Sequence, residues 1–203
     1  MQRQKPRNKV VVGLTGSFGS GKTTVAMILK AFGAECIDAD ALAHDCLRPG
    51  TNPYRRIVRL FGRDIVRPDK AIDRARLGRI AFSDSRAVRR LNSFIHPEVI
   101  RKIKYRIKSS RKKVVILDVP LLIESGLDKI VDMIIVVKAT QKNQIARLKK
   151  RSGLSASDIK KRCSYQIPLR QKMRAADFVI DNNDSISETK KQVARIRRKL
   201  WRN

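Results

Sequence analysis

Cysteines, aromatic residues and long apolar runs are scarce in this chain. It has three cysteines in 203 residues, with neither the paired spacing of a metal site nor the even count of a disulfide framework. No apolar run reaches the roughly 18 to 20 residues that a membrane-spanning helix needs, and the basic N-terminus has no apolar segment behind it. These absences argue against a disulfide-stapled, zinc-binding or membrane protein. We expect a cytoplasmic protein whose cysteines are reduced.

Acidic residues are also few. Lysine and arginine number 47 against 18 aspartates and glutamates, which gives a net charge of +29. Such an excess attracts nucleotides, phosphate-rich coenzymes, RNA and anionic membranes alike, so it does not choose among them. A nucleic-acid-binding protein is the alternative from another functional class. However, aromatic residues make up only 5% and are not interleaved with the basic clusters, and no nucleic-acid-binding motif is readable. We therefore retain only nonspecific RNA contact through the basic surface.

The most specific pattern is the stretch GLTGSFGSGKTTVA at 13–26. It matches the phosphate-binding loop G-x-x-x-x-G-K-[ST], between a β-branched run and a segment with helical apolar spacing. We expect Lys22 to reach the β- and γ-phosphates of a nucleoside triphosphate and the Thr23 hydroxyl to bind Mg²⁺. The motif alone leaves open whether the protein is a switch, a motor or a kinase. The residues assigned to nucleotide binding in this loop are Gly16, Ser17, Phe18, Gly19, Ser20, Gly21, Lys22, Thr23 and Thr24.

The order of apolar runs predicts an α/β fold. Short β-branched runs alternate with helical segments, except in a middle region from 49 to about 110 that reads as several helices. This alternation predicts a parallel sheet that is covered on both faces and binds ligands at the carboxyl ends of its strands. The expected strands lie at 9–15, 35–40, 113–120, 132–139 and 176–182.

Carboxylates stand at the ends of two of these runs. Asp38 and Asp40 point the same way if the strand continues through them, and Asp40 could then accept a proton from an attacking hydroxyl. The alternative is that Asp40 caps the following helix. Asp118 closes another strand, where a carboxylate could hold Mg²⁺ through water. Glu124 follows in PLLIE, where it could bind acceptor hydroxyls or support a neighbouring cation.

Together, these motifs resemble the dephospho-CoA kinase family. The resemblance covers nearly the whole chain: GLTGSFGSGKTTVA, IDADALAH, PG at 49–50, IDRARLGRIAF, HPEV, DVPLLIESG, the arginines of QIARLKKRSG, SYQ and RAADFVIDN. It implies transfer of the ATP γ-phosphate to the ribose 3′-hydroxyl of dephospho-CoA, the last step of coenzyme A synthesis. The substrates would be ATP and dephospho-CoA, with Mg²⁺ as cofactor.

The resemblance also implies an architecture. It is a P-loop kinase fold, with a five-stranded parallel sheet flanked by helices, a helical acceptor-binding insertion and a small helical lid. The insertion would lie at about 48–110 and the lid at about 140–171. We expect a single kinase domain at 9–203 and, because few apolar residues precede Val10, a disordered basic tail at 1–8.

The resemblance assigns roles on the phosphate side. Asp40 would be the catalytic base, Lys22 the phosphate clamp, Thr23 the direct Mg²⁺ ligand and Asp118 a water-mediated one. Asn182, at the end of the last strand, would lie near the adenine of ATP.

The lid and the acceptor side receive the remaining roles. Arg147 and Arg151 are four residues apart, hence on one helix face, and could close over the transferring phosphoryl group. The alternative for both is a solvated basic helix. The acceptor-binding residues would be Asp40, Arg74, His96, Leu121 and Glu124.

Several positions keep alternatives open. Arg74 could be a surface arginine of a helix capped by Asp73, and HPEV could mark a helix start with Pro97 in its first position, so that His96 only packs or caps. Gln166 could brace the lid without touching a ligand. The chain also departs from the family pattern at SF in the loop, at PDKA and at NDS. The nearest rival is a nucleoside or nucleotide kinase on the same scaffold, and the oligomeric state stays open.

Overall fold

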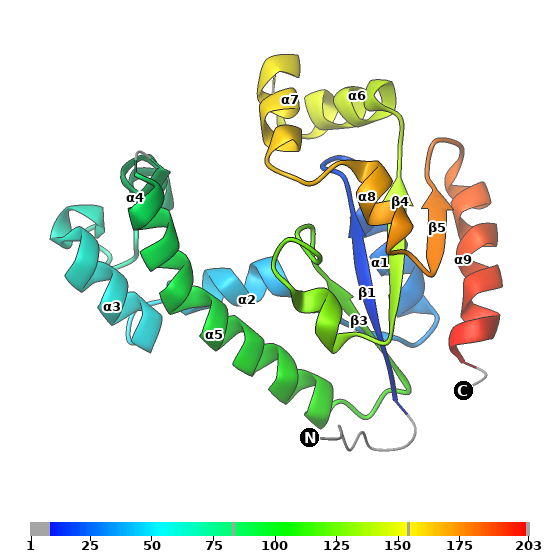
Figure 1. Cartoon of the computed structure of the whole chain (residues 1–203), viewed down its shortest axis with the longest axis horizontal. Coiled ribbons are helices and arrows are strands. Elements are labelled where there is room, and N and C mark those ends of the chain that lie inside the picture. Colours follow the sequence, from blue (N-terminus) through cyan, green and yellow to red (C-terminus); the bar gives the residue numbers. More distant parts are fainter. Residues whose placement is uncertain (1–8, 83, 154, 202–203) are drawn as a thin grey trace. The chain divides into compact units, whose positions relative to one another are not determined.

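The computed structural model describes residues 9–82, 84–153 and 155–201 (Figure 1). The expected disordered tail at 1–8 lies outside these residues. The chain folds into two compact units, one formed by the chain up to Ile37 together with the chain from Ser110 onward, and the other by Asp38–Ser109. No helix of the described residues is long and apolar enough to cross a membrane.

A five-stranded parallel sheet forms the centre of the first unit, which confirms the expected α/β fold. The strand order is β2-β3-β1-β4-β5, and β1 is paired in parallel with both β3 and β4. The chain therefore moves to one side of β1 first and to the other side afterwards, which places a topological switch point at its carboxyl end. The strands are β1 (Val10–Gly16), β2 (Glu35–Asp38), β3 (Val114–Asp118), β4 (Met133–Lys138) and β5 (Phe178–Asp181).

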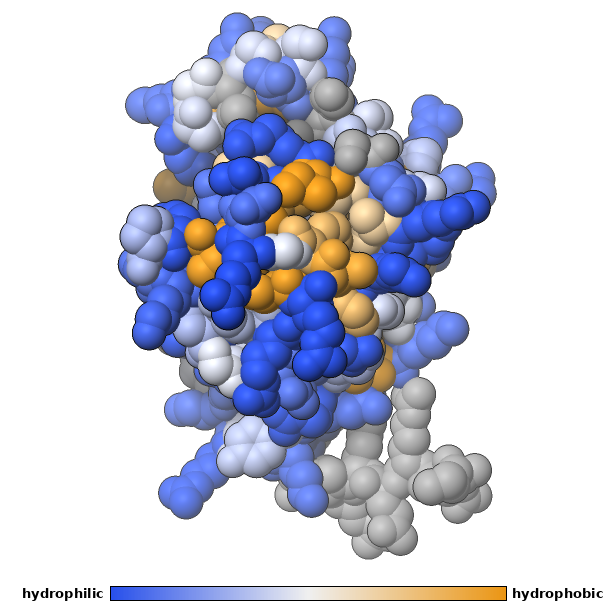
Figure 2. All heavy atoms as spheres, turned by 90° about the vertical axis from the view of Figure 1, so that its left-hand side faces the viewer, coloured by the Kyte–Doolittle hydropathy of each residue, from blue (hydrophilic) through white to orange (hydrophobic). Residues whose placement is uncertain are grey.

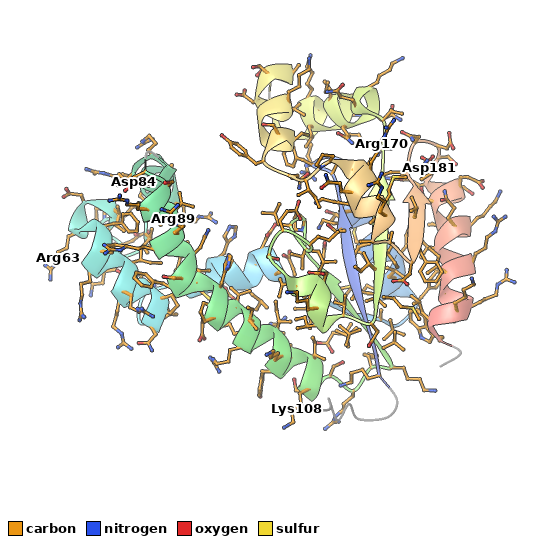
Figure 3. All side chains as sticks on the ribbon, in the orientation of Figure 1. Arg63, Asp84, Arg89, Lys108, Arg170 and Asp181 are labelled. Atoms are coloured by element: carbon orange, nitrogen blue, oxygen red, sulfur yellow. The ribbon has the colours of Figure 1, made fainter. Side chains whose placement is uncertain are left out.

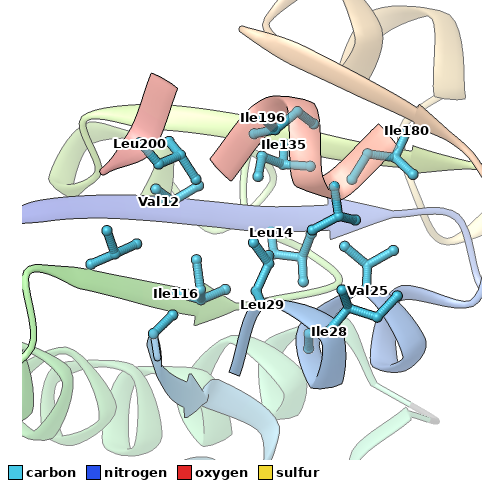
Figure 4. Packing of buried hydrophobic residues seen from close by; sticks show 14 of the residues in the cluster. Val12, Leu14, Val25, Ile28, Leu29, Ile116, Ile135, Ile180, Ile196 and Leu200 are labelled. Carbon is cyan, nitrogen blue, oxygen red and sulfur yellow. The ribbon is translucent and has the colours of Figure 1, made fainter. Parts of the chain in front are cut away.

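One cluster of the core lies against one face of this sheet (Figure 4). Alternate residues of a strand point to the same face, so Val12 and Leu14 pack with residues of two helices. These helices are α1 (Lys22–Ala31), which contributes Leu29, and α9 (Ile186–Leu200), which contributes Ile196. The strands read as nearly continuous apolar runs because both faces are covered.

Three more helices follow β4 in the first unit: α6 (Gln141–Ser152), α7 (Ala156–Ser164) and α8 (Leu169–Arg174). Thr140 caps α6 by accepting a hydrogen bond from Asn143 N, and Gly153 ends the helix in a left-handed conformation. Ser155 caps α7 in the same way. Helices thus stand where the lid is expected, and their assignment as a lid stays a prediction.

The second unit is helical. A small core of Ile57, Ile65, Ile72 and Leu77 holds it together. The second unit begins at Asp38, about ten residues before the predicted insertion. It does so because the first helix after β2 packs against the long α5 of the same unit. Its elements are α2 (Ala39–Cys46), α3 (Asn52–Phe61), the 3₁₀ turn η1 (Arg63–Ile65), α4 (Arg74–Phe82) and α5 (Ser85–Ser109).

The helix start considered at HPEV is wrong. Arg86 N donates to Asp84 Oδ1 (2.8 Å), so the helix begins at that cap and runs through Pro97 (Figure 3). Proline in a helix leaves the carbonyl four residues earlier without its usual partner. Here that carbonyl belongs to Ser93, and both Ser93 and Pro97 are exposed, so water can satisfy it.

Apolar and charged side chains line a hollow on the second unit. Figure 2 shows apolar side chains gathered on this face and ringed by hydrophilic ones. A cavity of about 520 Å³ is lined here by Leu60, Phe61, Ile80, Asp84, Arg86, Ala87 and Arg90. Arg63 and Lys108 of the same unit are exposed and point away from the helices (Figure 3). This surface accounts for part of the positive charge.

Candidate functional site

The glycine-rich loop joins the end of β1 to α1 in the order that the motif predicts. Gly21 immediately precedes the helix with φ at 86°, a left-handed conformation that side chains disfavour. At Gly16 an added Cβ would collide with the carbonyl oxygen of Val137. The loop backbone therefore runs where only glycine fits at these two positions.

The start of α1 can bind an anion. The first N–H groups of a helix have no partner within the helix, and its dipole favours negative charge at that end. The first turn contains Lys22, Thr23 and Thr24 and has no acidic residue. A phosphate group suits this position.

Lys22 and Asp118 form an ion pair beside the loop. Lys22 Nζ contacts Asp118 Oδ1, and the two side chains are 16% and 13% exposed. They meet because β3 and β1 are neighbours, with Asp118 in register with Leu14, just before the loop. Two residues that were assigned separately from the sequence are thus brought together.

The Ser20 hydroxyl is buried without a hydrogen-bond partner among the described residues. The residue is 1% exposed, and its Oγ lies beside Gly16 at the end of β1. Buried hydroxyls almost always bond to something, so this one indicates a ligand group or an ordered water.

Asn182 and Arg147 clamp the other side of the loop. Asn182 Nδ2 donates to Ser20 O (2.8 Å), and its Oδ1 accepts from Thr189 Oγ1 (2.8 Å). Arg147 Nη2 donates to Asn182 O (2.7 Å), and its Nη1 donates to Ser20 O (3.4 Å). An arginine of α6 is therefore held at the phosphate-binding loop.

The two arginines of the predicted lid differ in their contacts. Arg147 is half-buried at the loop, whereas Arg151 is exposed and no described residue bonds to it. The side chain of Asn182 is used by protein groups, so any contact with adenine stays a prediction. Sequence reasoning missed Thr189, which looks like an ordinary polar residue of a helix.

Two further contacts tie the segment before α8 to the rest of the unit. Gln166 Oε1 accepts from Phe18 N (2.9 Å), so Gln166 contacts the glycine-rich loop, and its role as a brace of the lid stays a prediction. Glu124 Oε1 accepts from Ile167 N (3.1 Å) and pairs with Lys172 Nζ (2.9 Å). Glu124 thus supports a neighbouring cation, whereas Leu121 is exposed.

The prediction for Asp38 and Asp40 needs a correction. The chain becomes helical at Ala39, so strand geometry does not continue through the two aspartates. Asp38, not Asp40, caps α2, because Asp38 Oδ1 accepts from Ala41 N (3.0 Å). Asp40 lies in the first turn of the helix and is exposed. This removes the capping alternative for Asp40 and gives Asp38 a structural role.

Two other residues of the second unit are exposed. Arg74 is the first residue of α4, and Asp73 caps this helix by accepting from Arg76 N (2.9 Å), which lowers the pKa of Asp73. His96 lies within α5. Both side chains are accessible to a ligand, and no described bond engages them.

The donor set at the loop fits Mg²⁺ bound together with a nucleotide. The described residues contain no group of three acidic, histidine or cysteine side chains that could hold a metal alone. Mg²⁺ at phosphate sites is held by one or two protein oxygens, with phosphates and water completing the shell. The exposed Thr23 at the start of α1 and the carboxylate of Asp118 are oxygen donors of this kind.

Comparisons with known proteins agree with this geometry. A family model described as dephospho-CoA kinase matches residues 10–188. A dephospho-CoA kinase of Carboxydothermus hydrogenoformans is 42% identical over 195 residues, which cover 95% of this chain and 94% of that protein.

Solved structures also match over nearly the whole chain. A Thermus thermophilus protein matches with a TM-score of 0.86 at 30% identity, over 95% of this chain and 98% of that one. A dephospho-CoA kinase from Campylobacter jejuni matches with a TM-score of 0.64 at 26% identity, over 96% of this chain and 99% of that one.

Proposed function

Since the chain belongs to the dephospho-CoA kinase family, we propose that it transfers the γ-phosphate of ATP to the ribose 3′-hydroxyl of dephospho-CoA. The products are coenzyme A and ADP. The observation that carries the proposal is the glycine-rich loop, with Lys22 and Asp118 paired beside the start of α1.

The loop is proposed to hold the triphosphate. The N–H groups at the start of α1 bind the β- and γ-phosphates, and the Lys22 ammonium exchanges part of its contact with Asp118 for phosphate oxygens. Arg147, held by Ser20 and Asn182, supplies positive charge where the transferring phosphoryl group gathers negative charge. The exposed Arg151 is proposed to close over the same phosphoryl group. The transfer is direct and in line, without a covalent enzyme intermediate.

Magnesium is the proposed cofactor. Thr23 would bind it directly and Asp118 through water, and the ion would supply positive charge that offsets the charge of the phosphates. The unpartnered Ser20 hydroxyl is available to a phosphate oxygen or to an ordered water of that shell.

The second unit is proposed to recognise the acceptor. Dephospho-CoA carries a pyrophosphate and a long, largely uncharged arm, which suits a hollow that both apolar side chains and arginines line. Asp40 accepts the proton of the attacking hydroxyl, and Arg74 and His96 bind the acceptor. Leu121 and Glu124 of the first unit are also proposed to bind the acceptor. Both bonds of Glu124 use Oε1, so Oε2 remains for an acceptor hydroxyl.

The acceptor is tested by measuring ADP release with Mg²⁺-ATP. Dephospho-CoA, AMP, CMP, deoxynucleosides and no acceptor are compared, and the product of each active pair is identified by mass. We expect strong stimulation by dephospho-CoA alone, with coenzyme A as product. If a nucleoside or nucleotide stimulates ADP release instead, the assignment of dephospho-CoA as the acceptor is wrong, while the proposed mechanism of phosphoryl transfer stands. Lys22→Ala should abolish turnover with an unchanged circular dichroism spectrum.

The base is tested with two neighbouring aspartates. Asp40→Asn should abolish turnover and leave the fold intact. Asp38→Asn is the matched control, because asparagine caps a helix as well as aspartate does, and it should keep its activity. Near-native turnover of Asp40→Asn would remove its assignment as the base.

The excess positive charge is proposed to steer anionic substrates and to allow nonspecific contact with RNA. Such RNA binding should fall steeply with added salt and leave ATP turnover unchanged. A competing function as an RNA-dependent enzyme requires turnover only when RNA is present. We also propose a cytoplasmic location, which cell fractionation tests, and the oligomeric state is left to light scattering.

A further inference from the structure

A lysine is completely buried in the first unit. Lys172 lies on the short helix α8, where most neighbours are exposed, among them Arg170 (Figure 3). Its side chain is 0% exposed. Lysine is almost never fully buried unless it is paired, because removing an ammonium from water is costly. An apolar residue of similar size would fill the space without that cost, so the ammonium itself calls for an explanation.

The ammonium of Lys172 holds two groups. Lys172 Nζ donates to Pro120 O (2.7 Å) and pairs with Glu124 Oε1 (2.9 Å). Both partners lie in the segment that follows β3, and β3 ends with Asp118. A charge-assisted bond to a backbone carbonyl is stronger than a neutral one, so it fixes this segment firmly.

The same carbonyl has a second donor. Thr15 Oγ1 donates to Pro120 O (3.0 Å), and Thr15 is itself 0% exposed. One residue earlier, Val119 N donates to Leu14 O (3.0 Å). Successive residues after Asp118 are therefore bonded to β1 and to Lys172, which holds the backbone that follows Asp118 in place.

The pair also reaches the segment between α7 and α8. Glu124 Oε1 accepts from Ile167 N (3.1 Å), and the adjacent Gln166 accepts from Phe18 N in the glycine-rich loop (2.9 Å). Lys172 follows this segment on α8. The buried Lys172–Glu124 pair thus lies where the chain that comes back from the predicted lid contacts the segment after β3.

We infer that Lys172 is a positioning residue for the phosphoryl transfer. It does not touch the substrates; its bond to Pro120 O, shared with Thr15, holds Asp118 where the carboxylate can orient Mg²⁺ and Lys22. The inference rests on the proposed function, because it assigns a task to the Mg²⁺ ligand of that reaction. No signal in the sequence distinguishes this lysine from its many exposed counterparts.

Two variants test the inference in the full-length enzyme. Lys172→Met keeps an unbranched apolar side chain that is one atom shorter and removes the ammonium. Thr15→Val keeps the shape and removes the other donor to Pro120 O, without any change of charge. The control is Leu200→Ala, which truncates a core residue of α9 that is 1% exposed and not part of this network.

Three quantities are measured for each protein: kcat at saturating substrates, the Mg²⁺ concentration for half-maximal rate, and the melting temperature. We expect Lys172→Met to lower kcat at least tenfold and to raise the half-maximal Mg²⁺ concentration severalfold. Thr15→Val should shift the Mg²⁺ dependence in the same direction by a smaller factor. Leu200→Ala should lower the melting temperature and leave the Mg²⁺ dependence unchanged.

The outcomes separate positioning from support of the fold. If Lys172→Met and Thr15→Val only lower the melting temperature, as Leu200→Ala does, the network is structural and the inference fails. If Lys172→Met does not fold, Thr15→Val decides through the Mg²⁺ dependence alone. Mg²⁺-dependent binding of a fluorescent ATP analogue is measured in parallel. If the wild-type protein makes no coenzyme A, the proposed function fails, and the Mg²⁺ dependence of ATP binding still decides the role of Lys172.

Discussion

Removing the side-chain amide of Asn182 should loosen the phosphate-binding loop. The residue is 5% exposed, and its amide bridges Ser20 O and Thr189 Oγ1, each at 2.8 Å. Asn182→Ala deletes both bonds. Each is worth about 1 kcal/mol net, and a buried group left without a partner costs about 1–3 kcal/mol more.

The remaining contacts limit the loss. Ser20 O keeps its bond from Arg147 (3.4 Å), and Thr189 Oγ1 keeps its bond to Ser185 O (3.2 Å). We therefore expect Asn182→Ala to reduce the free energy of unfolding by about 2–3 kcal/mol. For a chain of this size this lowers the melting temperature by about 4–12 °C. The KM for ATP should rise about tenfold, equivalent to 1.4 kcal/mol, because Ser20 and Gly21 lose their support.

Thr189→Val provides the comparison. It removes the bond to Asn182 Oδ1 and keeps the donor from Asn182 to Ser20. Because the buried Asn182 Oδ1 loses its partner, Thr189→Val should cost about 2 kcal/mol or more and leave the KM for ATP nearly unchanged. Thermal unfolding by circular dichroism and steady-state kinetics measure both quantities, and the double variant gives the coupling between the residues. A melting temperature of Asn182→Ala within 2 °C of wild type, or equal KM effects for both single variants, would refute the reasoning.

Three further predictions concern single side chains. Gly21→Ala should cost at least about 2 kcal/mol and abolish detectable ATP binding by calorimetry, because φ is 86° and the new methyl would collide with Asn182 Nδ2; retained affinity contradicts this. The bond from Lys138 lowers the pKa of Asp181, so the pair stabilises the fold above the ordinary aspartate range and loses its effect as pH falls. In urea unfolding, Asp181→Asn should therefore be less stable than wild type at pH 7 by under about 1 kcal/mol, and this difference should shrink as the pH falls below the ordinary aspartate range and through the lowered pKa of Asp181. Burial, with a contribution from a nearby carboxylate, raises the pKa of Cys36 to about 11. At pH 8 this thiol should react at least about tenfold more slowly with a disulfide reagent than free cysteine does, in a protein with serine at the other two cysteines; a fast reaction contradicts its burial.

The phosphate-binding loop was predictable because its signals are local. A β-branched run, glycines at fixed spacing and an amphipathic segment specify β1, the loop and α1 within a short stretch of chain. The sequence assigned Lys22 and Asp118 to the same site but did not predict their ion pair, which forms because the carboxyl ends of adjacent parallel strands meet at one edge of the sheet. Sequence reasoning succeeded where neighbours along the chain decide the structure.

The errors arose where a position had two local solutions. Either Asp38 or Asp40 could cap α2, and the pattern of residue types favours neither. Pro97 is common at a helix start, yet an upstream cap at Asp84 had already begun the helix. In both places the choice depends on where the preceding residues turn, which residue types alone do not specify.

Buried polar contacts were the least predictable part of the site. Lys172 carries the same charge as dozens of exposed residues, and its partners lie about fifty residues earlier in the chain. Such a contact exists only after the sheet has brought the two segments together. Glu124 was placed at the site from the sequence, but its cation could be identified only in the folded chain.

The connection between β2 and β3 has a consequence for how such an enzyme can diversify. These two strands are neighbours in the sheet, yet the chain passes through the whole of Asp38–Ser109 between them. The excursion has its own core and leaves the order of the strands unchanged. The excursion also carries the proposed base Asp40 in the first turn of α2, so only changes beyond that helix leave every group assigned to the transfer in place. The architecture therefore allows natural variation, or a protein engineer, to alter the acceptor-binding helices after α2 without changing the order of the strands.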